Sequence, residues 1–178
     1  IPPGYEQWHQ MGLYQRDLTS FNEEAIIDNR QTAFNCMNCH SFRMQSPDDM
    51  LFHMRADFGG TYVWTDGKLE KLDGKVSESI QSLVYPYWHP SGDYVAFSTN
   101  KTNQMFHMKD KNRIEVFDSA SDVLVYDVKN HRVLTDSLLF SKGAFETFPS
   151  FSPDGKTLYF STSMAQQMPK DYKSVKYS

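Results

Sequence analysis

The chain has 178 residues and a formal net charge of −4 at pH 7, and 39% of its residues are hydrophobic and 15% aromatic. This length and composition suffice for a domain with a hydrophobic core and exclude general disorder. An acidic balance without a run of Lys or Arg excludes a typical nucleic-acid-binding surface. No apolar stretch reaches the roughly 18–20 residues that a membrane-spanning helix needs.

We expect residues 1–34 to form an irregular lead-in with one short helix. Ser20-Phe21-Asn22-Glu23 has the pattern of a capping box, in which the serine and the glutamate each satisfy a free backbone amide at a helix start. Glu24-Ala25-Ile26-Ile27 would then form the first helical turn. The opening Ile1-Pro2-Pro3-Gly4 lacks the basic start and the apolar stretch of a signal peptide.

The most informative segment is Cys36-Met37-Asn38-Cys39-His40, which holds both cysteines of the chain. Cys-x-x-Cys-His is the attachment signature of a c-type haem. Two thiols three positions apart can add to the two vinyl groups of one porphyrin, and the histidine that follows is then placed to bind the iron. The sequence therefore predicts one covalent haem c per chain, bound through Cys36 and Cys39, with His40 on the iron.

Other interpretations of this motif remain open. A zinc site needs two further ligands at similar spacing, and the chain has no second cysteine pair. A thioredoxin-like motif should open a helix within a βαβ unit, which the surrounding sequence does not suggest. A disulfide or a free dithiol at Cys36 and Cys39 is the form that the motif would take without haem. Covalent haem attachment implies thiol chemistry outside the cytoplasm, so we expect a periplasmic, outer-membrane or cell-surface anchored protein, with a leader or lipid anchor ahead of residue 1.

The sixth iron position has several candidates, of which His53 is preferred. In an extended strand His53 and Met54 point to opposite faces, so at most one of them can face the iron. A second histidine would give a lower potential than a methionine. The adjacent Arg55 is a candidate partner for a haem propionate, and a solvated charge at a strand edge is its equally weighted alternative. The other candidate ligands are Met54, Met44, His9 and His107.

From about residue 46 the pattern changes to short strands separated by turns rich in Pro, Gly, Asp and Asn. Thr65-Asp66-Gly67 is typical of a tight hairpin between strands at Thr61–Trp64 and Lys68–Leu72. Further strands are expected at Arg113–Phe117, Asp122–Asp127 and Arg132–Leu134.

Two of these strand regions repeat each other, one around residues 85–99 and the other around 147–161. The residues Pro86, Pro90, Gly92, Phe97 and Ser98 recur as Pro149, Pro153, Gly155, Phe160 and Ser161. A weaker third copy begins at Ser46-Pro47-Asp48-Asp49. One Ser-Pro-Asp-Gly segment would indicate only a turn, whereas three copies favour a repeat array.

The spacing of the copies matches a β-propeller. Pro47 and Pro90 lie 43 residues apart, which is the length of one four-stranded blade. Pro90 and Pro153 lie 63 residues apart, which suggests a blade with an insertion of about 20 residues at Asn100–Asn112. The sequence thus predicts an all-β chain with about three blades over residues 46–178, preceded by a haem-binding lead-in over residues 1–45. The three prolines should lie at equivalent turns.

This part of the chain resembles the TolB-like, WD-repeat-like β-propeller repeats. Their signature, Pro-x-aromatic-Ser-Pro-Asp-Gly followed by a strand ending in Phe-Ser, is matched nearly throughout by Phe148–Ser161. In the copy at residues 86–98, His89 and Ser91 replace the usual Ser and Asp. The combination with Asn-Cys-x-x-Cys-His-Ser-Phe is similar to a group of extracytoplasmic bacterial proteins in which a c-type haem motif precedes such a propeller. Over residues 33–178 the resemblance implies a fold and a haem, and it implies no activity.

Three blades do not close a propeller, which has at least four. The resemblance to TolB-like proteins implies six. We therefore expect the remaining blades to come from the same polypeptide or from another chain, because open repeat ends need a cover. The terminal Tyr172–Ser178 run should lie against a neighbouring strand.

The sequence carries no phosphate-binding loop, nucleophile elbow or zinc-protease motif. Three hypotheses about function follow. The first is an extracytoplasmic electron-transfer protein with a haem c, a propeller docking scaffold and a redox protein partner. The second is a propeller module that binds a protein or a glycan, with the haem structural or absent. The third is a haem enzyme that reduces a small oxidant. A fold of this kind does not choose between them.

Overall fold

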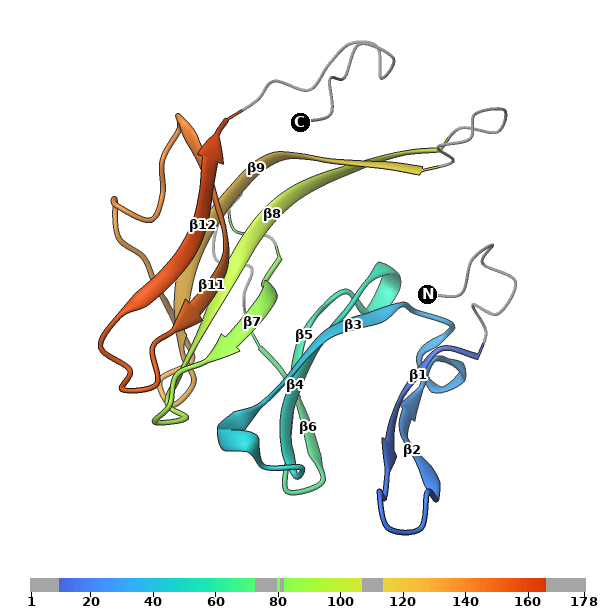
Figure 1. Cartoon of the computed structure of the whole chain (residues 1–178). Helices are drawn as coiled ribbons and strands as arrows, with labels where there is room; N and C mark the ends of the chain where they lie inside the picture. Colours follow the sequence, from blue (N-terminus) through green and yellow to red (C-terminus); the bar gives the residue numbers. More distant parts are fainter. Residues whose placement is uncertain (1–9, 73–79, 81, 107–113, 166–178) are drawn as a thin grey trace. The chain divides into compact units, whose positions relative to one another are not determined.

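The computed structural model describes residues 10–72, 80, 82–106 and 114–165. The chain divides into two compact units, residues 1–74 and residues 75–178. Both units consist of antiparallel sheets, and the first unit also has short 3₁₀ turns, which confirms the predicted all-β class. Within the described ranges no helix is long and apolar enough to span a membrane. Figure 1 shows the order of the strands along the chain.

The first unit opens with a hairpin where the sequence predicted a helix. Strand β1 (Gly12–Arg16) pairs with β2 (Glu23–Asp28). The predicted capping box is therefore wrong: the Ser20 hydroxyl donates to the carboxylate of Asp17 and closes a turn. Cross-strand partners explain the outcome, because Arg16 forms an ion pair with Glu23 across the hairpin. Such pairs, and the β-branched isoleucines that follow, favour a strand.

The haem motif forms part of a four-stranded sheet in this unit. The sheet contains β3 (Met37–Phe42), β4 (Asp49–Met54), β5 (Gly60–Thr65) and β6 (Lys68–Lys71), and each strand pairs with the next. The predicted lead-in thus includes the first strand of a sheet. Three 3₁₀ turns, η2 (Asn29–Thr32), η3 (Arg43–Gln45) and η4 (Ala56–Phe58), connect the strands. The predicted tight hairpin is confirmed, and its turn has two residues: Asp66 and Gly67, both with positive φ, join Thr65 to Lys68.

A hydrophobic core cluster of the first unit lies on one face of this sheet. Side chains of alternate β4 residues project to the same face, as expected for an extended strand. They pack against β2 and the start of β3, in the cluster Ile27, Met37, Met50, Phe52 and Met54.

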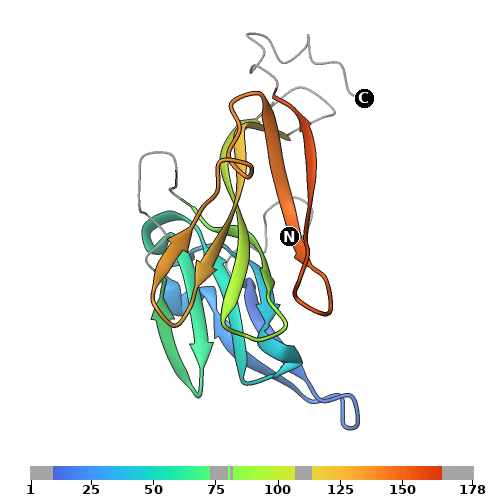
Figure 2. The ribbon, with the colours of Figure 1, turned by 90° about the vertical axis from the view of Figure 1, so that its left-hand side faces the viewer.

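The second unit contains a four-stranded sheet and a hairpin. The sheet is built from β7 (Val84–Trp88), β8 (Tyr94–Phe106), β9 (Ile114–Asp127) and β10 (Arg132–Leu134), again with each strand beside the next. The hairpin consists of β11 (Ala144–Phe151) and β12 (Leu158–Met164). Figures 1 and 2 both show β11 alongside the sheet, and β11 packs against β7, β8 and β9.

The two repeat copies in the second unit have the same backbone. Gly92 and Gly155 have φ of +74° and +70°, and each donates its N–H to the carbonyl oxygen three residues earlier. His89 and Ser152 each donate their N–H to the carbonyl oxygen five residues later. The predicted equivalence of the two glycines is confirmed, and both turns need a residue that tolerates positive φ.

Pro47 matches these turns less closely. It lies in the connection between β3 and β4, as Pro90 lies between β7 and β8. That first connection includes the turn η3, in which Met44 and Gln45 have positive φ. The third copy is therefore equivalent in topology, and its turn has a different backbone, which explains its weak sequence match.

The predicted insertion near Asn100–Asn112 extends two strands. Residues 100–106 belong to β8, and they pair with residues 114–121 of β9. Residues 107–113 lie outside the described residues. Thr102 and Asn100 both donate side-chain hydrogen bonds to the carboxylate of Asp118, at 2.6 and 2.8 Å. Polar residues of the insertion thus form hydrogen bonds between the two strands of a long hairpin.

Candidate functional site

The cysteine motif begins directly before β3, continues along it and includes a β-bulge. Asn38 pairs with His53 and Ser41 pairs with Leu51, so Cys39 and His40 together stand opposite one β4 residue. Cys39 has φ of +56°, a conformation that is costly for a residue with a Cβ. The bulge breaks the regular alternation that would send Cys36 and Cys39 to opposite faces.

The second unit shows that this bulge belongs to the repeat. The first strand of each of its copies has the same register shift, between Val84 and Tyr87 and between Thr147 and Ser150. In each case the first residue inside the shift has positive φ: 50° at Tyr85 and 53° at Phe148. Cys39 therefore occupies the position of these two aromatic residues. The strained backbone is a property of the repeat, and the thiol is what distinguishes the copy that contains β3 and β4.

The two thiols are free and differ in exposure. Cys36 is buried, and Cys39 is half-buried. Burial raises the pKa of the Cys36 thiol; a charge on Cys39 would raise it further, and the nearby Arg55 guanidinium lowers it. Cys36 therefore stays a neutral thiol at pH 7.

His40 presents an exposed imidazole beside the bulge. Its ring meets the ring of Phe42 edge-on, at 5.9 Å between centroids. Among the described residues it has no hydrogen-bond partner. Each cysteine directly follows an asparagine in the sequence. The side-chain oxygens of these two residues, Asn35 and Asn38, are buried and have no hydrogen-bond partner in the described structure. Such buried orphan acceptors are uncommon in proteins.

His53 lies on β4, which pairs with β3 on one side and with β5 on the other. It is buried, and its Nδ1 lies 3.1 Å from the Thr61 hydroxyl. It is a neighbour of His40 across the β3–β4 ladder, one step out of register. Adjacent strands lie about 5 Å apart, which leaves no room for a porphyrin between two such side chains. The ladder therefore does not bring His53 and His40 to opposite sides of one haem.

The other predicted site residues are separated by the fold. Met54 packs in the core cluster of the first unit, on the face opposite to His53, as the alternation predicted. Met44 is exposed in η3. The exposed Arg55 donates its N–H to the Cys36 carbonyl at 2.9 Å, which places it next to the motif. His9 and His107 lie outside the described residues.

The residues at the motif fit a covalent haem by their donor chemistry. Two free thiols and an imidazole without a hydrogen-bond partner in the described chain lie within five residues. A cation, Arg55, stands beside the first thiol, where it suits a propionate. No group of three or more His, Cys, Asp or Glu side chains gathers in the ranges that the structure describes. The donor set is thus that of the haem motif itself.

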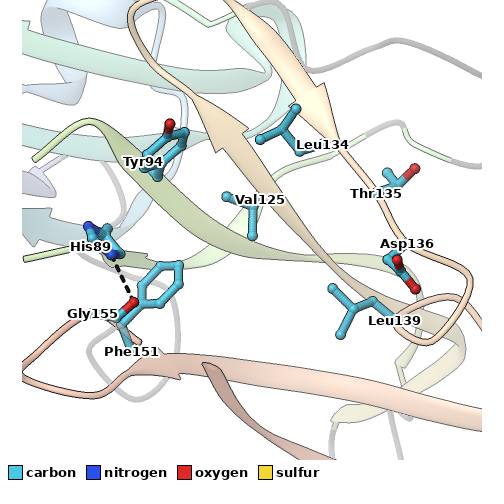
Figure 3. Close-up of a pocket in the computed structure, with 9 residues that line it drawn as sticks. All are labelled: His89, Tyr94, Val125, Leu134, Thr135, Asp136, Leu139, Phe151 and Gly155. Atoms are coloured by element: carbon cyan, nitrogen blue, oxygen red, sulfur yellow. Dashed lines mark hydrogen bonds between the residues drawn. The ribbon is translucent and has the colours of Figure 1, made fainter. Parts of the chain in front are cut away.

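A second candidate site, which the sequence did not indicate, lies in the second unit. A cavity of about 330 Å³ opens between the sheet β7–β10 and the β11–β12 hairpin (Figure 3). Its lining residues are His89, Tyr94, Val125, Leu134, Thr135, Asp136, Leu139, Phe151 and Gly155. In the sequence, only His89 could have pointed to this site, because it replaces the usual serine of the repeat.

His89 is a structural wall of this cavity. The Ser91 N–H donates to its Nδ1 at 3.1 Å, so that nitrogen carries no proton. Its Nε2–H therefore donates to the Gly155 carbonyl at 3.0 Å, the bond drawn in Figure 3. Both ring nitrogens are used, which explains why the repeat departs from its usual residue here.

No family model matches the sequence, and none of the curated proteins matches it. Among solved structures the chain is similar to the dipeptidyl peptidase 4 of Porphyromonas gingivalis, with a TM-score of 0.51 and 13% identity. The match covers 86% of this chain and 25% of that one. The chain therefore spans about a quarter of the length of that protein, and the likeness shows an all-β fold.

Proposed function

We propose that this protein is an extracytoplasmic, bacterial c-type haem protein that transfers electrons and uses a partial β-propeller as a docking scaffold. The observation that carries the proposal is the motif at the β3 bulge: two free thiols and an exposed imidazole, with Cys36 directly before the strand and Cys39 and His40 within it. When bound, the haem would supply a one-electron couple. The sequence contains no phosphate-binding loop, nucleophile elbow or zinc-protease motif that would favour a different chemistry.

The chain's own residues would hold and orient the haem. Cys36 and Cys39 would bind it through thioethers, and His40 would bind the iron. The neutral Cys36 thiol suits this role, because a buried, protonated thiol resists oxidation before attachment. Arg55 would pair with a propionate. The strand pair β3–β4 would fix the attachment point, because Met37 of β3 and alternate residues of β4 are anchored in the core of the first unit.

The phenylalanine that stands opposite each bulge supports the proposed propeller. Phe52, Phe97 and Phe160 stand opposite the bulge in their respective strand pairs. The first two are fully buried, whereas Phe160 is 37% exposed. Its neighbour Tyr159 is 60% exposed. We infer that further strands of the same repeat, from this polypeptide or another chain, cover β12.

Protein purified from its own host tests the haem. We expect an intact mass that includes one haem, and a haem absorption spectrum that survives denaturation. Replacing both cysteines by alanine should abolish the covalent haem, and each single replacement should leave one thioether. Arg55→Gln should keep the haem attached and shift its potential. Lys68→Gln, which removes an exposed positive charge from β6 of the same unit, serves as the matched control for Arg55→Gln.

Haem-free native protein with two titratable thiols, or with a disulfide between Cys36 and Cys39, would overturn the proposal. A five-coordinate, high-spin spectrum would favour an enzyme that acts on a small oxidant over an electron carrier. A six-coordinate, low-spin spectrum together with rapid reduction by a partner protein would support the carrier.

A further inference from the structure

The cavity in the second unit is a feature of the packing between sheet and hairpin, and it does not involve the haem motif. Its floor comes from the sheet, where Leu134 of β10 pairs with Val125 of β9, so both side chains project to one face. Its opposite wall is Phe151, at the end of β11. Figure 3 shows these side chains around the same space. A volume of about 330 Å³ lies at the lower end of the range for small-molecule sites.

The turn at one end of the cavity is held in place by His89. Its bond to the Gly155 carbonyl joins the two repeat turns, and its ring meets those of Phe151 and Tyr94 edge-on, at 4.9 and 5.8 Å. A side chain at Gly155 would occupy this space, since a Cβ there would lie 2.4 Å from Nε2 of His89. The cavity is therefore preformed by a hydrogen bond and by three aromatic rings.

The charge of the lining has one sign. Within the part of the chain that the structure describes, Asp136 is the one charged residue that lines the cavity, and no Lys or Arg lines it. Its Oδ1 accepts the Leu138 N–H at 2.8 Å, which fixes the carboxylate at the rim. Among the described residues, the second carboxylate oxygen has no recorded partner. Aromatic rings can also attract cations, and Tyr94 and Phe151 are among the residues that line the cavity.

We propose that this cavity binds small apolar organic cations, with the ammonium group at Asp136 and the apolar part against Val125 and Phe151. A ligand with one ring and a short aminoalkyl chain fits the size of the site. Binding needs no movement of the sheet, because the walls are already in place. The carboxylate disfavours an anion of the same size, and none of the described lining residues is a Lys or an Arg that could offset this.

Titration of the full chain with 2-phenylethylamine tests this site. We expect a dissociation constant of about 1 mM, the range for so few non-hydrogen atoms. The amide signals of Leu139 and Gly155 should shift in NMR spectra, and that of Gly67 in the first unit should not. The matched ligand 3-phenylpropionate should bind at least about fivefold more weakly, because it brings a carboxylate to Asp136.

Asp136→Asn is the decisive variant, because its amide oxygen can still accept the Leu138 N–H and keep the turn. It should weaken binding of 2-phenylethylamine by about three- to fivefold. Asp66→Asn, an exposed turn carboxylate in the first unit, is the matched control and should change nothing. Equal affinity for both ligands, an unchanged affinity in Asp136→Asn, or absence of any shift at Leu139 and Gly155 would overturn the proposal.

Discussion

The imidazole of His89 donates from Nε2 to the carbonyl oxygen of Gly155, 66 residues away in the sequence, at 3.0 Å. The two residues belong to consecutive copies of the same repeat turn. Through this bond the turn before β8 and the turn before β12 support each other. The residue that departs from the repeat pattern is thus the residue that joins two copies.

This relationship predicts the cost of a side chain at Gly155. Gly155→Ala should destabilise the protein by about 1 kcal/mol for its positive φ and by a further 1–3 kcal/mol for the contact with His89. Gly67→Ala is the matched control, because Gly67 has φ of +73° and open space around its Cβ position. Gly67→Ala should lose only the roughly 1 kcal/mol that comes from the positive φ. Urea unfolding measures both, and an equal loss in the two variants would show that His89 does not fill the space.

The ladder position of His53 predicts a spectroscopic result. In the second unit the corresponding strand position is held by Ser98, which bonds to the Thr147 hydroxyl and accepts the Phe148 N–H. We therefore expect His53→Ser, in the haem-loaded protein, to leave the optical spectrum unchanged. His40→Ser should change it, because an iron ligand is lost. A shift from low to high spin in His53→Ser would instead identify His53 as the sixth ligand and require that β3 and β4 separate.

A carboxylate pair in the second unit predicts a pH dependence. Burial, followed by the charge of Glu146, raises the pKa of Asp122. Glu146 is only 4% exposed, and its Oε2 has no hydrogen-bond partner. The folded state therefore holds the Asp122 proton more tightly than the unfolded chain does. The stability from this proton is complete below the unfolded pKa of about 3.9, and it is lost as the pH rises through the folded pKa.

Asp122→Asn should consequently raise the unfolding free energy at pH 7 and flatten its pH dependence just above pH 4. Asp154→Asn provides a control of opposite sign. The Ser152 hydroxyl, followed by the Lys156 N–H, lowers the pKa of Asp154, so its contribution is present at pH 7 and lost as the pH falls through the folded pKa. Thermal melts from pH 3 to 8 compare the two variants. Destabilisation by Asp122→Asn at pH 7 would contradict this prediction.

The equivalent phenylalanines predict where the repeat is incomplete. Phe97→Ala should cost about 3–5 kcal/mol, because Phe97 is fully buried. Phe160→Ala should cost at most about 2 kcal/mol in the 178-residue chain. Equal costs, measured by chemical unfolding, would mean that β12 is already covered in this chain.

Much of the fold could be predicted from the sequence, because it depends on local chemistry. Gly92 and Gly155 are needed wherever a turn demands positive φ, and alternating strands between such turns indicate an all-β chain. The thiol spacing of Cys36 and Cys39 likewise indicates a haem motif without any structure. These features are set by residues close together in the chain.

Tertiary structure decided the rest, because it depends on partners distant in the sequence. Local pattern favoured a helix after Ser20, whereas cross-strand pairing with β1 made residues 23–28 a strand. Register determined that Cys39 shares a bulge position with Tyr85 and Phe148, and that His53 is a cross-strand neighbour of His40. The cavity exists only where the β11–β12 hairpin meets the sheet. Sequence spacing specifies which residues are available, and strand register determines which of them meet.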